Sequence, residues 1–212
     1  SQAPTFFSLW IGNNDVLGYA TSGGDGTNPI TPSAGVAGAG FDATYDALVN
    51  TLTSTGAKGV VANIPYVNTV PFFTYIATNP VPLNATQVAQ LNPLFKAMND
   101  MLAFAGQPAR FQTLTASSTN PLLIADEMLA FDATALYTGG FTQAGYPAAT
   151  AAFLGALYGK ARHASNAVAT RDYILLTAGG TIGTTKPGYP ATNSTIGVTF
   201  PMEDKATLTA SE

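Results

Sequence analysis

An apolar, strand-like segment near the N-terminus ends abruptly in two amides and a carboxylate. Residues 5–11 read TFFSLWI, and Gly12, Asn13, Asn14 and Asp15 follow directly. A side-chain amide is a neutral donor with two N–H groups, and fixed donors stabilise negative charge that develops on a substrate. Glycine lets the backbone turn sharply where a strand ends. We therefore interpret this strand end as a site where an amide stabilises a substrate anion.

The spacing of apolar residues predicts a strand–helix–strand unit around this site. Residues 5–11 and 59–64 are apolar runs typical of buried strands. Between them, four apolar side chains recur at helical spacing and Gly56 is placed to end the helix; the four are Phe41, Tyr45, Leu48 and Leu52. Such a unit is typical of a right-handed crossover in a parallel sheet. The polar segment 63–68 should then lie beside Asn14, at the carboxyl edge where open parallel sheets place their sites.

The remaining chain shows further helical and strand patterns. The Gly/Ser/Thr-rich residues 18–40 predict a long loop that covers the site. Asn84 and Gln87 resemble a capping box before a helix with buried Leu91, Phe95, Met98 and Leu102, in which Pro93 should introduce a kink or a new start. We also expect helices over 121–137 and 147–163, a strand over 173–178 and a loop or hairpin over 179–197.

Composition excludes several classes of function. The length of 212 residues favours one domain, 1–212. Charged residues make up 9%, and with a net charge of −4 no Lys/Arg cluster could neutralise phosphates, so we expect no nucleic-acid partner. The sequence contains no run of about 18 apolar residues, so it predicts no membrane span. There is no cysteine, which excludes disulfides and thiolate sites. Sparse charge favours an exported protein (periplasmic, cell-surface or secreted) whose signal peptide has been removed.

The strand-end motif resembles the third sequence block, Gly-x-Asn-Asp, of the SGNH or GDSL-like ester hydrolases. The longer strings WIGNNDVLGYA (10–20), NIPYV (63–67) and DYILLTA (172–178) resemble the middle of the larger SGNH-type lipase/acylhydrolases of Bacteroidetes. The resemblance implies a three-layer α/β sandwich with a mostly parallel, flavodoxin-like sheet. It also implies a serine mechanism without metal or organic cofactor. In it Asn14 donates to the oxyanion, while Gly12 and Asp15 shape the loop, Asp15 by accepting backbone N–H bonds.

The other catalytic blocks of that family have no match in this chain. Gly24-Asp25-Gly26 lacks the hydroxyl of the family's Gly-Asp-Ser block, and the single histidine, His163, has Lys160 three residues before it instead of Asp. The resemblance therefore implies that the nucleophile and the Asp-x-x-His base lie outside residues 1–212. We expect this chain alone to be inactive, and an exposed sheet edge to favour self-association or a partner that supplies the missing segments.

Alternatives to this interpretation remain open. Asn14 or Asp15 could simply cap a helix that begins near Val16. The chain could also be a non-catalytic binding or surface protein, for glycans or lipids, on the same scaffold. The aromatic side chains of Tyr66, Phe72, Phe73 and Tyr75 could line an acyl pocket or belong to the core.

Titratable residues elsewhere favour structural roles. His163 lies in GKARHASNAV, which we interpret as a polar helix end, and a lone histidine is more often structural or solvated than catalytic. The carboxylates show no recurrent metal-ligand spacing. The adjacent pairs Asp126-Glu127 and Glu203-Asp204 are predicted to be solvated surface residues.

Overall fold

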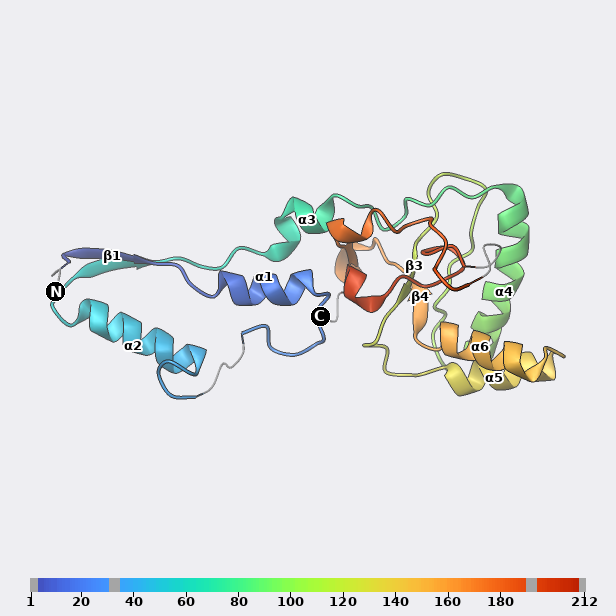
Figure 1. The fold of residues 1–212 in the computed structure, drawn as a ribbon, viewed down its shortest axis with the longest axis horizontal. Coiled ribbons are helices and arrows are strands. Elements are labelled where there is room, and N and C mark those ends of the chain that lie inside the picture. Colours follow the sequence, from blue (N-terminus) through green and yellow to red (C-terminus); the bar gives the residue numbers. More distant parts are fainter. Residues whose placement is uncertain (1–3, 31–34, 190–193, 210–212) are drawn as a thin grey trace.

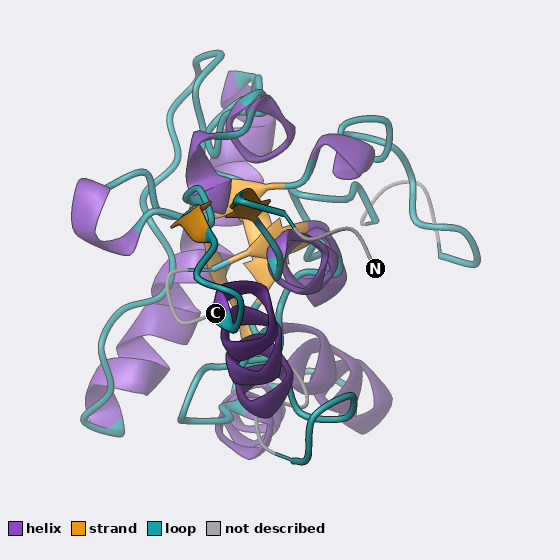
Figure 2. Ribbon diagram, turned by 90° about the vertical axis from the view of Figure 1, so that its left-hand side faces the viewer, coloured by secondary structure: helices purple, strands orange, loops and turns teal. Residues whose placement is uncertain are grey.

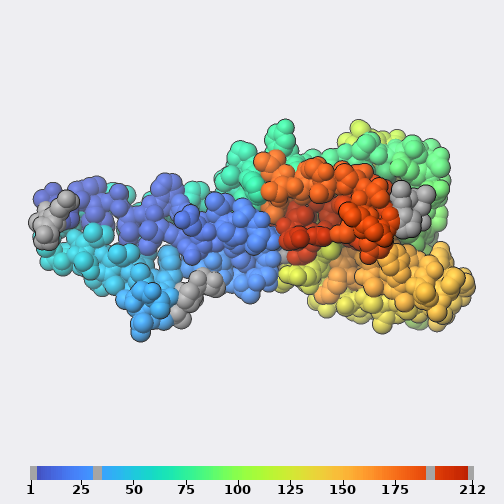
Figure 3. Space-filling model, in the orientation of Figure 1, coloured from blue at the N-terminus to red at the C-terminus, as the bar shows by residue number. Residues whose placement is uncertain are grey.

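A narrow N-terminal arm projects from a broader C-terminal body (Figures 1 and 3). The computed structural model describes residues 4–30, 35–189 and 194–209. We call residues 4–30 and 35–66 the arm, and the later described residues the body. The helices are α1 (Asn13–Thr21), α2 (Phe41–Thr53), α3 (Pro71–Thr74), α4 (Ala85–Phe104), α5 (Thr134–Gln143) and α6 (Ala148–Tyr158). The strands are β1 (Phe6–Leu9), β2 (Lys58–Val61), β3 (Leu123–Ala125), β4 (Ala161–His163), β5 (Tyr173–Ile174) and β6 (Thr207–Leu208).

The arm contains the predicted strand–helix–strand unit. β1 and β2 pair in parallel, in a register that runs from Phe6 opposite Lys58 to Leu9 opposite Val61. The two strands approach closely where the Phe7 ring covers Gly59, since a Cβ atom at Gly59 would lie 2.4 Å from that ring. The helix between them, α2, begins at Phe41, as its apolar spacing predicts. The expectation of a parallel pair with a helical connection is therefore confirmed.

The expectation that these strands are buried is wrong. The exposed fraction is 60% for Phe6, 58% for Trp10 and 55% for Val60. These side chains belong to one face of the two-stranded sheet, because strand side chains alternate and Val60 pairs with Ser8, between the two aromatic residues. None of the α2 residues is buried either. Parallel sheets normally have both faces covered, and no described element of this chain covers the face of Phe6 and Trp10.

The loop predicted over residues 18–40 is shorter than expected. α1 continues to Thr21, and turns follow it up to residue 30. Residues 31–34 of that predicted loop lie outside the described residues. Residues 35–40 lead directly into α2.

The body holds most of the apolar core. Leu9, Ala20 and Ala57 are the only buried apolar side chains that the described arm contributes. The capping box is confirmed: Gln87 N donates to Asn84 Oδ1 at 2.9 Å, and Asn84 N donates to Gln87 Oε1 at 3.0 Å. The four predicted apolar positions of α4 are buried, and the helix continues as one element through Pro93; the four are Leu91, Phe95, Met98 and Leu102.

Two helices of the body pack closely through glycine. A Cβ atom at Gly155 of α6 would lie 2.0 Å from Thr138 Oγ1 and 2.7 Å from Thr134 O of α5. Glycine at this position therefore permits the α5–α6 approach. α6 confirms the helical part of the segment 147–163, but the helix ends at Tyr158, and residues 161–163 form β4.

The secondary structure of two other segments differs from the prediction. In 121–137, residues 123–125 form β3, which pairs antiparallel with β4, and the helix starts only at Thr134. In 173–178, only residues 173–174 are strand, and Leu176–Ala178 form a 3₁₀ turn. Short apolar runs fit either a strand or a buried helix, and only a distant partner strand decides between them.

The fold is a mixed helix–strand architecture with small sheets. The described residues form three two-stranded sheets, of which β1–β2 is parallel, while β3–β4 and β5–β6 are antiparallel. Figure 2 shows these short strands among helices and long loops, viewed along the long axis. The predicted α/β class fits the parallel pair, but no three-layer sandwich is formed by the described residues. None of the described helices is both long and apolar enough to cross a membrane.

Candidate functional site

The strand end after β1 requires glycine at residue 12. Gly12 has a φ of 94°, a left-handed conformation that residues with a side chain rarely adopt. A Cβ atom there would lie 2.9 Å from Ile64 Cδ1 and 3.2 Å from Phe41 Cζ. The backbone therefore turns at Gly12 against residues from the end of β2 and the start of α2. Helix α1 starts at Asn13, directly after this turn. Its first backbone hydrogen bond runs from Val16 N to Gly12 O at 3.2 Å.

Asn14 presents an exposed amide at the start of α1. It is the second residue of the helix, and its side chain makes no hydrogen bond within the described part of the chain. The alternative that Asn14 or Asp15 caps the helix is wrong, because the N-cap is Gly12 and no side chain caps α1. The amide is therefore available to a ligand, beside the N-terminal N–H groups of α1, which carry partial positive charge.

Asn13 and Asp15 complete the start of the helix. Asn13 Oδ1 is a buried acceptor that has no hydrogen-bond partner among the described residues. Asp15 is exposed in the first turn of α1, where a carboxylate favours the helix dipole. It accepts none of the hydrogen bonds identified in the described residues, so the expected role of Asp15 in holding the loop is not supported.

The ends of the two parallel strands lie at one edge of the sheet. Ala62 N donates to Leu9 O at 3.0 Å, so the chain after β2 runs beside the chain after β1. Two aromatic side chains that follow these strands in the sequence are exposed: Trp10, directly after β1, is 58% exposed, and Tyr66, further along the chain after β2, is 81% exposed. Of the other aromatic residues considered for an acyl pocket, Phe73 is fully buried in the core.

The only histidine of the chain is remote from this edge and structural. His163 lies in β4 of the body, whereas β1 and α1 lie in the arm (Figure 1). Its side chain is buried, with Nδ1 accepting a hydrogen bond from Gln112 N at 2.8 Å and the ring meeting Phe95 edge-on at 4.8 Å. Burial lowers the pKa of His163 to about 4. The structural interpretation is therefore confirmed, although its surroundings are buried and are not the polar helix end that we expected.

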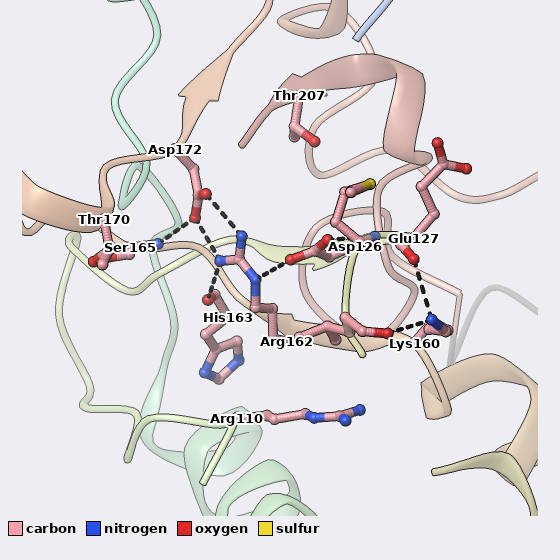
Figure 4. A network of polar contacts seen from close by, with 12 residues as sticks. Arg110, Asp126, Glu127, Lys160, Arg162, His163, Ser165, Thr170, Asp172 and Thr207 are labelled. Carbon is pink, nitrogen blue, oxygen red and sulfur yellow. Dashed lines mark hydrogen bonds and ion pairs between the residues drawn. The ribbon is translucent and has the colours of Figure 1, made fainter. Parts of the chain in front are cut away.

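A buried ion network surrounds Arg162 of β4 (Figure 4). Arg162 Nε donates to Asp126 Oδ2 at 2.6 Å, while Nη1 and Nη2 donate to the two carboxylate oxygens of Asp172 at 2.6 and 2.8 Å. Burial lowers the pKa of Arg162, but the hydrogen bonds and charges of Asp172 and Asp126 more than offset this effect and raise it overall. The prediction that Asp126 is a surface residue is wrong, since it is 3% exposed.

The acceptors in this network are also used by backbone groups. Asp172 Oδ2 accepts from Ser165 N at 2.7 Å, and Asp126 Oδ1 accepts from Met128 N at 2.9 Å. The Ser165 hydroxyl contacts Thr170 Oγ1 at 2.9 Å, and no contact to a histidine is identified among the described residues. The network therefore joins the end of β3, β4 and the start of β5. We interpret it as a structural element, because each charged group in it is satisfied.

The second carboxylate pair lies nearer the surface, as predicted. Glu203 Oε1 accepts from Lys186 Nζ at 2.7 Å and Glu203 Oε2 contacts Lys205 Nζ at 2.8 Å, with half of the Glu203 side chain exposed. Asp204 is half-buried and accepts from Glu127 N at 3.0 Å. Within the described ranges, no three histidine or acidic side chains are close enough to hold a metal ion.

Comparison of this chain with protein-family models, curated proteins and solved structures found no match. Function is therefore inferred from the residues and geometry of the chain itself.

Proposed function

We propose that this chain forms part of an ester or acyl hydrolase of the SGNH, GDSL-like type, in which Asn14 donates to the oxyanion. The observation that carries the proposal is the turn at Gly12, whose left-handed φ and crowded surroundings exclude a side chain. This turn presents Asn14 at a sheet edge, exposed and with no side-chain hydrogen bond to the described residues. In ester hydrolysis the carbonyl oxygen gains negative charge, and one aligned donor is worth about 2.7–4 kcal/mol in the transition state.

The nucleophilic serine and the base belong, in this proposal, to residues outside 1–212. Two features of the arm support a further contact at the strand end: among the described residues, none donates a hydrogen bond to the buried Asn13 Oδ1 and none covers the face bearing Phe6 and Trp10. A further strand beside β1, followed by a helix, would cover that face and extend the sheet towards the three-layer sandwich of the family. We expect the partner to be such a segment. If no such segment is present, we expect it to be a second copy of the chain.

Replacement of Asn14 is the direct test. We expect Asn14→Ala, in the complete polypeptide encoded by the reading frame that contains residues 1–212, to lower kcat on p-nitrophenyl butyrate by about 10²–10³-fold. The reason is that only the charged transition state needs the amide, so KM should change little. Asn50→Ala is the matched control, because Asn50 is an exposed amide of α2.

Labelling with a fluorophosphonate probe separates the two parts of this proposal. A complete polypeptide with a nucleophilic serine is labelled, and Asn14→Ala should slow the labelling. If the complete polypeptide takes up no probe and hydrolyses no ester, the hydrolase proposal fails. If the isolated 212-residue chain hydrolyses the ester, the inference that its catalytic partners lie elsewhere fails.

A binding function at the same sheet edge is the second candidate. The rings of Trp10, directly after β1, and Tyr66, further along the chain after β2, are exposed. The single histidine of the chain lies in the body, so the described residues provide no histidine base at the strand ends. A surface protein that holds a glycan or lipid against these rings would need no base. Binding without fluorophosphonate labelling would favour this candidate. In both cases we place the protein outside the cytoplasm, because of its sparse charge.

A further inference from the structure

Two cavities of the body share part of their lining. Each has a volume of about 720 Å³, and Gln87, Thr195 and Val198 line both of them. One cavity extends from these shared residues between α4 and α6, and the other extends towards Tyr75 and Leu176. We call the two together the neutral groove. Each cavity is in the size range of small-molecule sites, and the two-part form of the groove suits an elongated ligand.

The neutral groove has no charged lining residue among those the structure describes. Another cavity of the body, by contrast, is lined by Arg110, Asp126 and Arg162. Binding of an ionic ligand in the neutral groove would remove water from its charge without supplying a counter-charge. The groove therefore favours an uncharged ligand.

Aromatic rings are presented at both ends of this groove. Tyr146, Phe153 and Tyr189 at one end are 40–43% exposed, and Tyr75 at the other end is 79% exposed. Tyr189 is held between two rings, with its centroid 5.8 Å from that of Phe153 and 4.9 Å from that of Phe200. Half-exposed rings that are fixed in a concave surface offer flat apolar faces to a ligand.

Uncharged polar groups lie between these rings. The side chains of Gln90 and Thr150 make no hydrogen bond within the described part of the chain. Gln87 is held in place because its Oε1 accepts from Asn84 N, and its amide nitrogen makes no hydrogen bond to the residues that the structure describes. A purely apolar ligand would bury such groups without partners, which is unfavourable.

From these observations, we propose that the neutral groove binds an uncharged oligosaccharide. A sugar ring has apolar C–H faces, which pack on aromatic rings, and hydroxyl edges, which exchange hydrogen bonds with amides and hydroxyls. An acyl chain could pack on the aromatic rings but could not exchange hydrogen bonds with the amides. Helices α4 and α6 lie at the opposite end of the molecule from β1 (Figure 1), and Asn14 belongs to α1 of the arm, so this binding does not depend on the proposed hydrolase function.

Native affinity electrophoresis of the 212-residue chain tests the proposal. Gels contain arabinoxylan, glucomannan, mixed-linkage β-glucan or starch, which are all uncharged, or polygalacturonate, which is anionic. We expect slower migration in at least one uncharged polysaccharide, and binding about tenfold weaker in Tyr189→Ala and in Phe153→Ala. Phe104→Ala is the matched control, because Phe104 is 93% exposed and lines neither cavity.

The variants remove half-exposed side chains, and their circular dichroism spectra should match that of the unchanged chain. Asn14→Ala should also bind the polysaccharide normally, which distinguishes this groove from the strand end. Unchanged migration in all four uncharged polysaccharides would overturn the proposal. It would also be overturned if Tyr189→Ala retained full binding, or if a fluorescent fatty acid bound the groove and no uncharged polysaccharide did.

Discussion

Asp172→Ala is expected to lower the free energy of unfolding by about 3–5 kcal/mol, the cost of removing one partner from a buried ion pair. The Asp172 side chain is fully buried and holds Arg162 through two hydrogen bonds. Without it, Arg162 keeps Asp126 as its one carboxylate partner among the described residues, and Ser165 N loses its acceptor. The measurement is urea unfolding at pH 7, followed by far-ultraviolet circular dichroism.

A surface ion pair provides the control for this prediction. Lys96 and Asp100 lie four residues apart on α4, with side chains 75% and 63% exposed. Asp100→Ala should therefore cost about 0.5 kcal/mol or less. Equal losses in Asp172→Ala and Asp100→Ala would show that the buried network does not hold β3, β4 and β5 together.

Acidification should destabilise the protein through His163. Its pKa falls from 6.5, the ordinary value, to about 4 in the folded chain because the ring is buried. The unfolded chain therefore binds a proton between these values while the folded chain does not. The stabilisation that the neutral His163 gives the folded chain is fully present above pH 6.5 and is lost as the pH falls towards 4. Since one pKa unit corresponds to 1.36 kcal/mol, the loss is roughly 3 kcal/mol.

The single histidine makes this prediction easy to assign. His163→Gln removes the titration, so the free energy of unfolding of the variant should change little between pH 6.5 and 4.5. Glu203 affects the free energy of unfolding only at lower pH. Hydrogen bonds from Lys186 and Lys205 lower its pKa to about 2, so the stabilisation that its carboxylate provides is lost only below pH 4.5. A stability profile of His163→Gln as steep as that of the unchanged chain would contradict the assignment.

Local signals in the sequence predicted those parts of the fold that depend on neighbouring residues. The capping box of Asn84 and Gln87 works over four residues, and both of its hydrogen bonds are present. The helical spacing that begins at Phe41 and the buried stripe of α4 are equally local. The turn at Gly12 belongs to the same class, because the left-handed conformation there excludes most side chains.

The parallel pairing of β1 with β2 was predicted although these strands are distant in sequence, but other features that depend on distant residues were not predictable. Residues 123–125 become a strand because residues 161–163 pair with them, and no spacing within 121–137 indicates this. Asp126 is buried because Arg162, 36 positions later, supplies its counter-charge. The exposure of Phe6 and Trp10 has the same origin, since an apolar run predicts burial but does not show whether another element is present to cover it.

The position of Trp10 decides which spectroscopic signal reports on which part of the molecule. It is the only tryptophan of the chain and is already in contact with water on the arm. Its emission should therefore change little when the body unfolds, and it should shift to shorter wavelength when another element covers the sheet face. Intrinsic fluorescence is thus a probe of assembly for this chain, whereas circular dichroism follows its unfolding.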